Sequence, residues 1–236
     1  GKCLCLRFHE LRERYGMART NLFLAAAICW LIATPAVAEI CPLPGETLNY
    51  TIFNDDDDVG GLELAFNQNG EQATVNVSMK ILVRILMVPA FRFKHSSTEV
   101  WSRDRLKTLT ANTSDNGDKF AISMKQIGDQ HEIKSEDGLN THKGTRLTEL
   151  LWCEGAARGG AIISTLTGNV SDIPIDFIGR EDIELNGRTI RTRHYRFVRK
   201  KRVGNFWYDE DGFLVKLTYP TRYYSVASFV LQDQGN

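Results

Sequence analysis

Short segments in which apolar and polar residues alternate dominate the chain, and the clearest of them runs from Thr74 to Val88. Successive side chains of a β-strand point to opposite faces, so this alternation predicts a strand with one apolar face. The residues of that face are Val75, Val77, Met79, Ile81, Val83, Ile85 and Met87. The opposite face is polar at its start and apolar at its end, and Pro89 predicts a bend or a change of strand.

Turn signals separate further segments of this kind over most of the chain. Asn-Gly and Asp-Gly pairs recur, and they supply the positive φ angles that tight hairpin turns require. We expect strands near 47–53, 61–67, 72–88, 90–101, 105–113, 118–126, 130–135, 173–178, 188–198, 204–209, 213–219 and 222–232. The predicted fold is mostly β, as a curved antiparallel sheet or half-barrel.

One segment, 146–166, interrupts the β pattern. It combines Thr148 to Glu154 with glycines at 155, 159 and 160. We expect short helical turns or a long loop here, with Thr148 as a helix cap. From its place in the chain, we expect this segment to cross the open mouth of the sheet as a plug.

Residues Met17–Ala38 have the features of a secretory signal peptide. Arg19 gives a positive start, residues 22–33 form an apolar run too short to span a bilayer, and Ala36-Val37-Ala38 fits the cleavage pattern. We therefore expect a periplasmic protein of one mostly-β domain, residues 39–236. Residues 1–16 are expected to be a start-site artefact, with a long charged start to the signal peptide as the alternative.

Charge excludes one class of partner. Residues 1–38 hold five of the 29 basic and two of the 29 acidic residues, which leaves residues 39–236 with a formal net charge of −3. A nucleic-acid-binding surface is expected to be basic, so no nucleic-acid partner is predicted. Contact with a membrane is expected to be peripheral at most. Arg191 to Arg202 is rich in Arg and Lys, and it is interpreted as the solvated side of a strand, with anionic lipid head groups as the alternative.

Cys41 and Cys153 are the two cysteines that remain after residue 38. In an exported protein, a pair of cysteines predicts a disulfide, and two unpaired thiols are the alternative. The bond would close a loop of about 110 residues and stabilise the fold by roughly 4–5 kcal/mol on the chain-entropy model.

Candidate catalytic and metal-binding residues are scarce. The Asp55–Asp58 run lacks the spacing of a calcium-binding EF-hand and is interpreted as a solvated hairpin tip. His95, His131, His142 and His194 are dispersed without a metal-ligand spacing. A nucleophilic Cys153 would need a histidine from elsewhere, and no nucleophile–base pair can be assigned. We predict no enzyme activity, no metal and no cofactor.

Two segments resemble DUF6134, an uncharacterised family of exported proteobacterial proteins. The first is Phe91–Trp101 followed by Arg105–Thr113 and Asn116-Gly117, which is similar to a stretch in members of that family. The second is Phe206–Asp209 followed by Gly212–Leu217, which is similar to the closing hairpin of the family. The Asp55–Asp58 run departs from the shorter turn expected there. The resemblance implies export and a fold similar to the half-barrels of lipoprotein carriers, which enclose an apolar cavity.

These observations favour a binding or carrier protein for an apolar or lipid-like ligand. The candidate ligand-binding residues are Val83, Arg84, Phe91, Arg92, Trp101, Trp152 and Trp207. The tryptophans are expected near the cavity, and Arg84 or Arg92 as partners of a ligand head group. The alternative is an envelope scaffold that binds other proteins through exposed strand edges. A carrier should contain an apolar cavity of several hundred Å³, whereas a scaffold should have a filled core.

The disulfide is directly testable in the protein isolated from an oxidising compartment. We expect one cross-linked peptide pair that contains Cys41 and Cys153, detected by mass spectrometry of a non-reduced digest. Reduction should separate the pair. If both thiols react with an alkylating reagent before reduction, the prediction is wrong.

Overall fold

The computed structural model describes residues 45, 47–102, 105–149, 151–157, 161–199, 202–221 and 225–232. All of them belong to the unit Ala38–Asn236. The predicted artefact at 1–16, the signal peptide Met17–Ala38 and Cys41 lie outside the described residues. Cleavage after Ala38 and the Cys41–Cys153 bond therefore stay predictions.

The described residues form one large sheet, a smaller sheet and one short helix. The large sheet contains β1 (Leu48–Asn54), β2 (Asp57–Asn69), β3 (Gln72–Ile85), β4 (Val88–Ser102), β5 (Arg105–Asp115), β6 (Asp118–Ile127), β7 (Gln130–Ser135), β8 (Gly138–Lys143), β12 (Ile175–Leu185), β13 (Arg188–Arg199), β14 (Arg202–Tyr208), β15 (Leu214–Pro220) and β16 (Val226–Leu231). The inner segment contains β9 (Thr145–Thr148), α1 (Glu154–Ala157), β10 (Ala161–Ile163) and β11 (Val170–Asp172). No helix among the described residues is long and apolar enough to cross a membrane.

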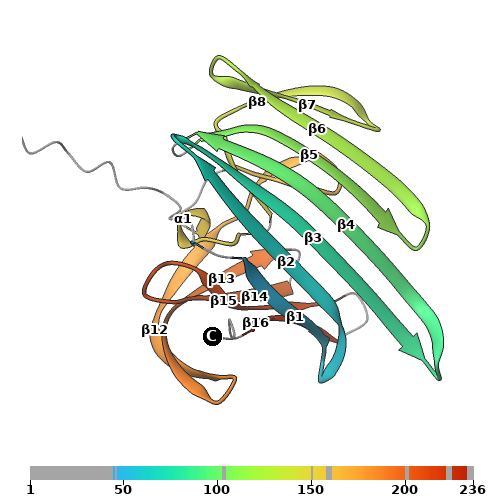
Figure 1. Cartoon of the computed structure of the whole chain (residues 1–236), viewed down its shortest axis with the longest axis vertical. Helices are drawn as coiled ribbons and strands as arrows, with labels where there is room; N and C mark the ends of the chain where they lie inside the picture. Colours follow the sequence, from blue (N-terminus) through green and yellow to red (C-terminus); the bar gives the residue numbers. More distant parts are fainter. Residues whose placement is uncertain are drawn as a thin grey trace, which may run out of the picture. The chain divides into compact units, whose positions relative to one another are not determined.

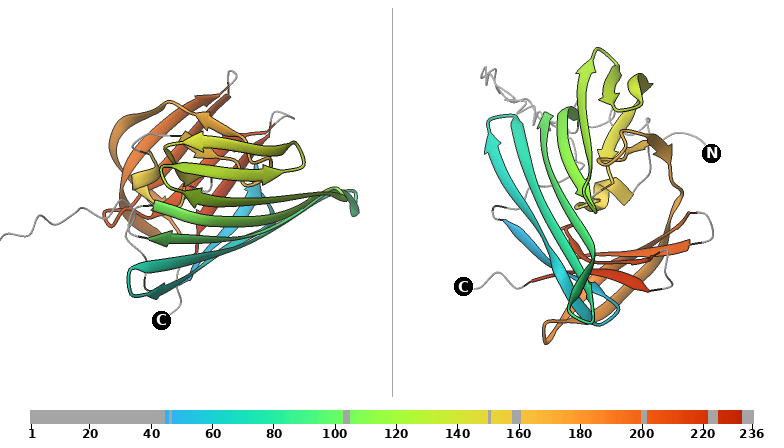
Figure 2. Two further views of the ribbon diagram at one scale, coloured as in Figure 1. Left: turned by 90° about the horizontal axis from the view of Figure 1, so that it is seen from above. Right: turned by 90° about the vertical axis from the view of Figure 1, so that its right-hand side faces the viewer.

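The large sheet is antiparallel throughout and consists of two meanders. Its order is β12-β13-β14-β15-β16-β1-β2-β3-β4-β5-β6-β7-β8, so the first strand pairs with the last and joins the two meanders. Figure 1 shows β2–β6 as long, nearly aligned strands with the shorter β1 beside β2, and β12–β16 as a second group that runs across them. The two turned views in Figure 2 show the same curvature, with the inner segment on the concave side. The predicted mostly-β antiparallel fold is confirmed, as a large open sheet.

Two of the predicted turns show why short loops suffice to connect these strands. Asn116 and Gly117 have φ angles of 50° and 104°, and Asn186 and Gly187 have φ angles of 52° and 76°. Positive φ at both central residues is the geometry that Asn-Gly pairs adopt readily. These pairs connect β5 to β6 and β12 to β13, as the sequence predicts.

The predicted long strand 72–88 ends earlier than expected. The chain reverses at Leu86 and Met87, whose φ angles are 48° and 65°, and β4 already begins at Val88. Pro89 therefore lies within β4 and does not mark the bend, which corrects the prediction. A left-handed conformation costs a residue with a side chain about 1–2 kcal/mol. Leu and Met therefore disfavour this turn, and the sequence contains no signal that predicts it.

The predicted plug of short helices is also corrected. In the described residues of the segment 146–166, the one helix is the four-residue α1, and the other regular elements are strands of the β9–β11 sheet. Thr148 is buried at the end of β9 and does not cap a helix. Ile162 and Ile163 are buried and β-branched, which favours a strand over a helix. The polar strand β8, whose side chains are exposed, was missed because it has no apolar face.

The core lies between the concave face of the large sheet and the inner segment. Alternate residues of the sheet are buried there, among them Tyr50, Leu64, Val75 and Leu109, as are Trp152 and Ile163 of the inner segment. A Cβ added at Gly168 would lie 3.0 Å from the side chain of Ile133, so the inner segment reaches as far as β7.

Gly204 marks a close approach on the same concave side. A Cβ at this position would lie 1.9 Å from the ring of Phe197, its cross-strand partner on β13. The missing side chain thus allows the Phe197 ring to lie flat over β14. The ring then stacks on Phe206 at 5.0 Å and on Tyr219 at 5.7 Å.

We expect Gly204→Ala to lower the free energy of unfolding by about 1–3 kcal/mol, because the new methyl group overpacks the site. Gly61→Ala, on β2 of the same sheet, is the matched control, because the added Cβ would meet its nearest atom, the Tyr50 carbonyl oxygen, at 3.4 Å. Its unfolding free energy should change by less than about 0.5 kcal/mol. Urea denaturation measures both, and equal effects would contradict the close approach.

Candidate functional site

Three adjoining cavities lie on the concave side of the sheet, and they are the candidate site. The first, of about 300 Å³, lies between the inner segment and β13–β16. The second, of about 190 Å³, is lined by both meanders, for example by Leu62 and Leu214. The third, of about 520 Å³, lies against β3–β6 and is more open. The first two share Glu149, Leu217 and Phe229 as lining residues, so they adjoin each other.

Aromatic and aliphatic side chains form the walls of the first cavity. Phe197, Phe206 and Tyr219 come from the inward positions of three successive strands, and Ile162 of the inner segment faces them. Apolar walls favour a ligand that is itself largely apolar, because both surfaces then leave water.

A polar stripe on β4 enters this otherwise apolar interior. His95, Ser97 and Glu99 occupy alternate positions and are all buried. His95 Nδ1 lies 2.8 Å from Thr113 Oγ1. His95 Nε2 and Ser97 Oγ have no hydrogen-bond partner among the described residues. His95 lines both the second and the third cavity, so a bound molecule can supply a partner there.

Burial shifts the pKa values of this stripe toward the neutral forms. It lowers the pKa of His95 from 6.5 to about 4. It raises the pKa of Glu99 from 4.5 to about 7, although a hydrogen bond from Trp101 Nε1 to Glu99 Oε2 at 3.0 Å acts in the opposite direction. Desolvation disfavours whichever form carries charge, so the two shifts have one cause.

Glu149 lies where the first two cavities meet. Its side chain is exposed, so this part of the site opens to solvent. Its Oε1 accepts hydrogen bonds of 3.1 Å from the backbone nitrogen and the hydroxyl group of Thr165. The contact connects the two ends of the inner segment beside the opening.

A buried ion pair anchors the inner segment to the sheet. Glu154 Oε1 of α1 accepts hydrogen bonds from Arg193 Nε at 2.7 Å and from the Tyr195 hydroxyl at 2.6 Å. Tyr208 also donates its hydroxyl to the backbone oxygen of Leu151 at 2.9 Å. Burial raises the pKa of Tyr208 above its ordinary value, and the nearby Tyr50, Tyr195 and Glu154 raise it further.

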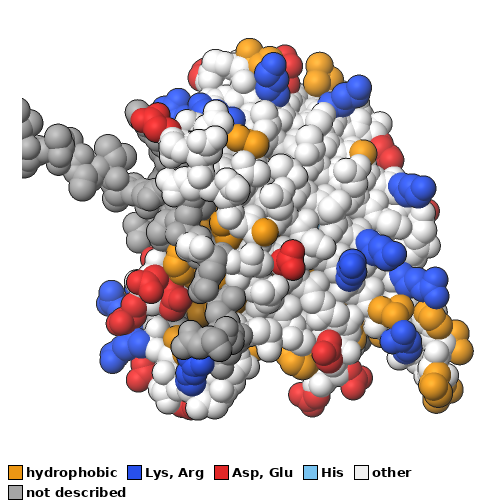
Figure 3. All heavy atoms as spheres, viewed as in Figure 1, with side chains coloured by type: hydrophobic (Ala, Val, Ile, Leu, Met, Phe, Trp, Pro, Cys, Tyr) orange, Lys and Arg blue, Asp and Glu red, His pale blue; other side chains and the backbone are white. Residues whose placement is uncertain are grey.

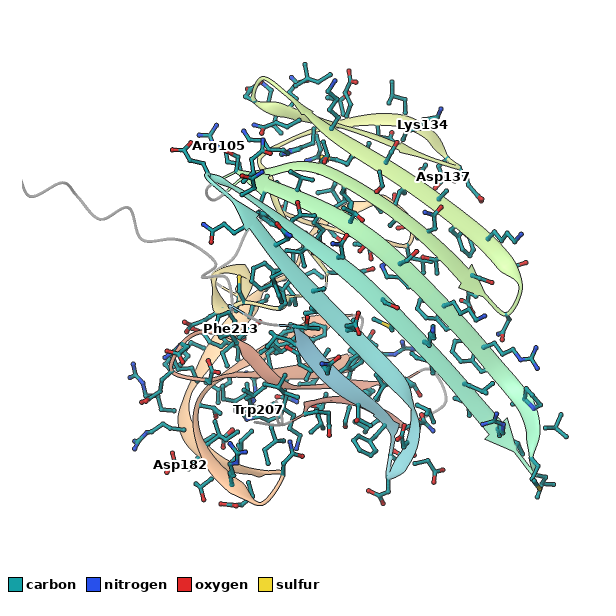
Figure 4. All side chains as sticks on the ribbon, viewed as in Figure 1. Arg105, Lys134, Asp137, Asp182, Trp207 and Phe213 are labelled. Carbon is teal, nitrogen blue, oxygen red and sulfur yellow. The ribbon has the colours of Figure 1, made fainter. Side chains whose placement is uncertain are left out.

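None of the seven predicted ligand-binding residues lines the three cavities. Trp101 and Trp152 pack edge to face in the core, with ring centroids 6.5 Å apart. Trp207, labelled in Figure 4, alternates with two buried residues and therefore points to the opposite face of β14. There it stacks on His194 at 4.6 Å, with the Lys216 ammonium group 5.5 Å from its ring.

The other four predicted residues lie on the β3–β4 hairpin, beyond the cavities. Val83 and Phe91 are cross-strand partners and half-buried, and Arg84 and Arg92 are exposed. Their neighbour Phe93 does line the second cavity. These four predicted residues thus lie beside the cavities, and their role in ligand binding stays a prediction.

Several lining residues were missed, although the alternation that could have found them is present in the sequence. Phe197, Phe206, Leu217 and Phe229 each occupy an inward position of a C-terminal strand. Alternation identifies which residues share a face, but it does not tell which face is concave.

The charged segments form local structure. Asp58 Oδ1 accepts a hydrogen bond from the backbone nitrogen of Gly60 within the turn, whereas Asp55 Oδ1 accepts one from the backbone nitrogen of Val226 and connects the turn to β16. In the basic segment, Arg191 lies 3.6 Å from Asp182 on the neighbouring strand. No group of three or more His, Cys, Asp or Glu residues suited to a metal occurs in the described part of the chain.

Comparison with known proteins gives a family and a fold. The profile of DUF6134, a domain of unknown function, matches residues 50–232, which confirms the resemblance. The crystal structure of a beta-barrel-like protein of the domain of unknown function DUF1849 from Brucella abortus is similar, with a TM-score of 0.55 and 13% sequence identity. The similarity covers 80% of this chain and 98% of that chain, and at this identity it shows the fold alone. No match was found among curated proteins.

The opposite pKa shifts of His95 and Glu99 predict opposite pH dependences of stability. Between about pH 4 and 6.5 the unfolded chain protonates His95 and the folded protein does not, so this histidine makes stability rise with pH. Between pH 4.5 and about 7 the folded protein holds a proton on Glu99 that the unfolded chain has lost, so this carboxyl makes stability fall with pH.

Removing one titrating group at a time should separate the effects of Glu99 and His95 on stability. Relative to wild type, Glu99→Gln should gain stability as pH rises from 4.5 to 7, and His95→Gln should lose stability as pH rises from 4 to 6.5. Each change should reach about 3 kcal/mol over its range. Urea denaturation at a series of pH values measures them. A pH-independent difference from wild type would show that the residue is not buried as described.

Proposed function

This chain belongs to the DUF6134 family, and from the geometry of its interior we propose that it is a periplasmic binding or carrier protein for an apolar or lipid-like ligand. The observation that carries the proposal is the row of adjoining cavities on the concave side of the sheet, two of them lined in part by the inner segment. Pockets for small molecules typically measure about 300–1,000 Å³, and the first and third cavities, of about 300 and 520 Å³, fall in that range. A core built for stability alone would be filled by side chains.

The walls suggest how an amphiphilic ligand would lie. Its apolar part fits the first two cavities, where Phe197, Phe206 and Leu217 offer apolar surface. Its polar part fits the third cavity, which is more open and where the inward side chains of His95 and Thr113 offer polar atoms. His95 stands between the two regions, and its unpartnered Nε2 would bond a polar group of the ligand.

Catalysis is not part of the proposal. Thr113 and His95 form a hydroxyl–imidazole pair, but burial lowers the pKa of His95 to about 4. A general base works best when its pKa lies near the operating pH, so this imidazole would be a weak base at neutral pH.

A scaffold that binds other envelope proteins remains the second candidate, and one observation favours it. The outer strands β12 and β8 are the ends of the sheet within the described residues, and every side chain of β8 is exposed. Such edges can pair with an added strand. This function needs no cavity, so the experiment below distinguishes the two candidates.

We expect the purified protein to take up N-phenylnaphthylamine, an apolar probe whose fluorescence rises on leaving water. Leu217→Trp should weaken uptake on the order of 10- to 100-fold, because the indole overpacks the junction of two cavities at a cost of about 1–3 kcal/mol. Mass spectrometry of organic extracts from the native protein would then identify the ligand.

Val203→Trp is the matched control, because Val203 is an exposed apolar residue on β14. It should leave uptake unchanged. Absence of uptake by the wild-type protein would reject the carrier proposal and favour the scaffold.

A further inference from the structure

The β3–β4 hairpin projects beyond the strands on either side of it. Within the described residues, β2 pairs with β3 only as far as Gly60 and Ile81, and β5 pairs with β4 only as far as Asp115 and Phe93. β3 and β4 continue to pair with each other up to Ile85 and Val88. Arg92 still bonds Asn116 through its backbone nitrogen and oxygen, both at 2.8 Å, so residues 82–91 form the free two-stranded ribbon. Its four residues beyond Ile81 extend about 13 Å at the usual rise of a strand.

The end of this ribbon is apolar and exposed. Ile85, Leu86, Met87 and Val88 are all exposed, and the exposed fractions of Leu86 and Met87 reach 93% and 90%. Both of these residues also hold positive φ angles, a geometry for which Asn-Gly is favoured. Neither stability nor solubility explains large apolar side chains here, and such patches on soluble proteins mark interaction sites.

Positive charge surrounds the apolar tip. The segment 72–98 contains four Lys or Arg residues and no Asp or Glu. These are Lys80, Arg84, Arg92 and Lys94, and none has an ion-pair partner in the described part of the chain. Figure 3 shows hydrophobic side chains gathered at this end of the molecule with Lys and Arg side chains beside them.

Acidic residues are also present beside the ribbon, and the Asp55–Asp58 run stands at the turn between β1 and β2, beyond the last pair of β2 with β3. Asp115 pairs with Phe93 and with Asp118, in the turn that follows β5. Asp57 and Asp58 lead into Gly60, which pairs with Ile81. The ribbon itself contains no acidic residue.

We propose that the tip Ile85–Val88 docks on a bilayer that contains anionic lipids. Apolar side chains at the surface of a membrane enter the boundary between head groups and acyl chains, about 5–10 Å deep, which the ribbon can reach. Arg84 and Arg92 then lie at the level of the anionic head groups. The combination of an apolar end and a purely basic flank fits this surface better than an acidic protein, which would leave the apolar end in water.

The inward face of the ribbon connects the docked tip to the interior. Ile81, Val83, Phe91 and Phe93 form an apolar strip on that face, and the rings of Phe91 and Phe93 stack at 6.4 Å. Phe93 also lines the second cavity. Docking would therefore place an apolar path between the bilayer and the cavities. The docking itself does not depend on whether the cavities bind a ligand.

The test replaces the tip by the residues that its backbone favours. Leu86→Asn combined with Met87→Gly removes both apolar side chains and relieves the φ strain, so the variant should unfold at the same or a higher urea concentration. Its partition onto vesicles of phosphatidylcholine and phosphatidylglycerol in equal amounts should fall on the order of 100-fold, as measured by co-sedimentation. A folded variant that binds as well as the wild-type protein overturns the proposal.

Charge and self-association are tested with the same vesicles. Arg84→Gln with Arg92→Gln should weaken binding to the mixed vesicles by roughly 30-fold and leave binding to phosphatidylcholine alone unchanged. Leu139→Asn, which removes an exposed leucine on β8, is the control and should have no effect. The alternative is that the tip binds a second copy of the chain. The membrane proposal is wrong if the wild-type protein does not bind vesicles but forms a dimer in analytical ultracentrifugation, and the tip variant does not form that dimer.

Discussion

The ion pair between Glu154 and Arg193 holds the inner segment over the large sheet, and the cavities depend on it. A sheet of thirteen strands must bury one face, yet the regular elements described in its cover are one helical turn and three short strands. The buried carboxylate with its guanidinium and Tyr195 partners fixes one end of that cover. Removing one member of such a pair costs about 3–5 kcal/mol, since the other charge stays buried. Because the cover is smaller than the face, unfilled space remains beneath it.

Local pattern predicted most of the sheet but little of the site. The alternation of Thr74 to Val88 and the Asn116-Gly117 turn report backbone geometry, which neighbouring residues determine. The turn at Leu86 and Met87 was not predicted, because both residues have positive φ angles that residues of these types rarely adopt. The tryptophans did not identify the lining of the cavities, because a large aromatic ring can equally well pack in a filled core, as Trp101 and Trp152 do. Which face of a strand is concave depends on contacts between distant strands, and no local pattern contains that information.

Two parts of the molecule depart from what stability alone would select, and both bear on function. His95 and Ser97 place unpartnered polar atoms in an apolar interior, and each such atom costs about 1–3 kcal/mol. The β3–β4 tip places apolar side chains in water on a strained backbone. In a sequence that otherwise agrees with its fold, such local conflicts are expected at functional sites.

The pairing of β1 with β16 also constrains the order of folding. Asp55 and Val226 exchange hydrogen bonds of 2.8 Å although they lie 171 positions apart, and β1 has no other partner on that side. Contacts between such distant residues form slowly. If the chain leaves the cytoplasm with its N-terminus first, β1 and β2 emerge long before β16. Until β16 pairs with it, the open edge of β1 would be exposed to other unfolded chains. Chaperone protection would therefore matter most at this edge.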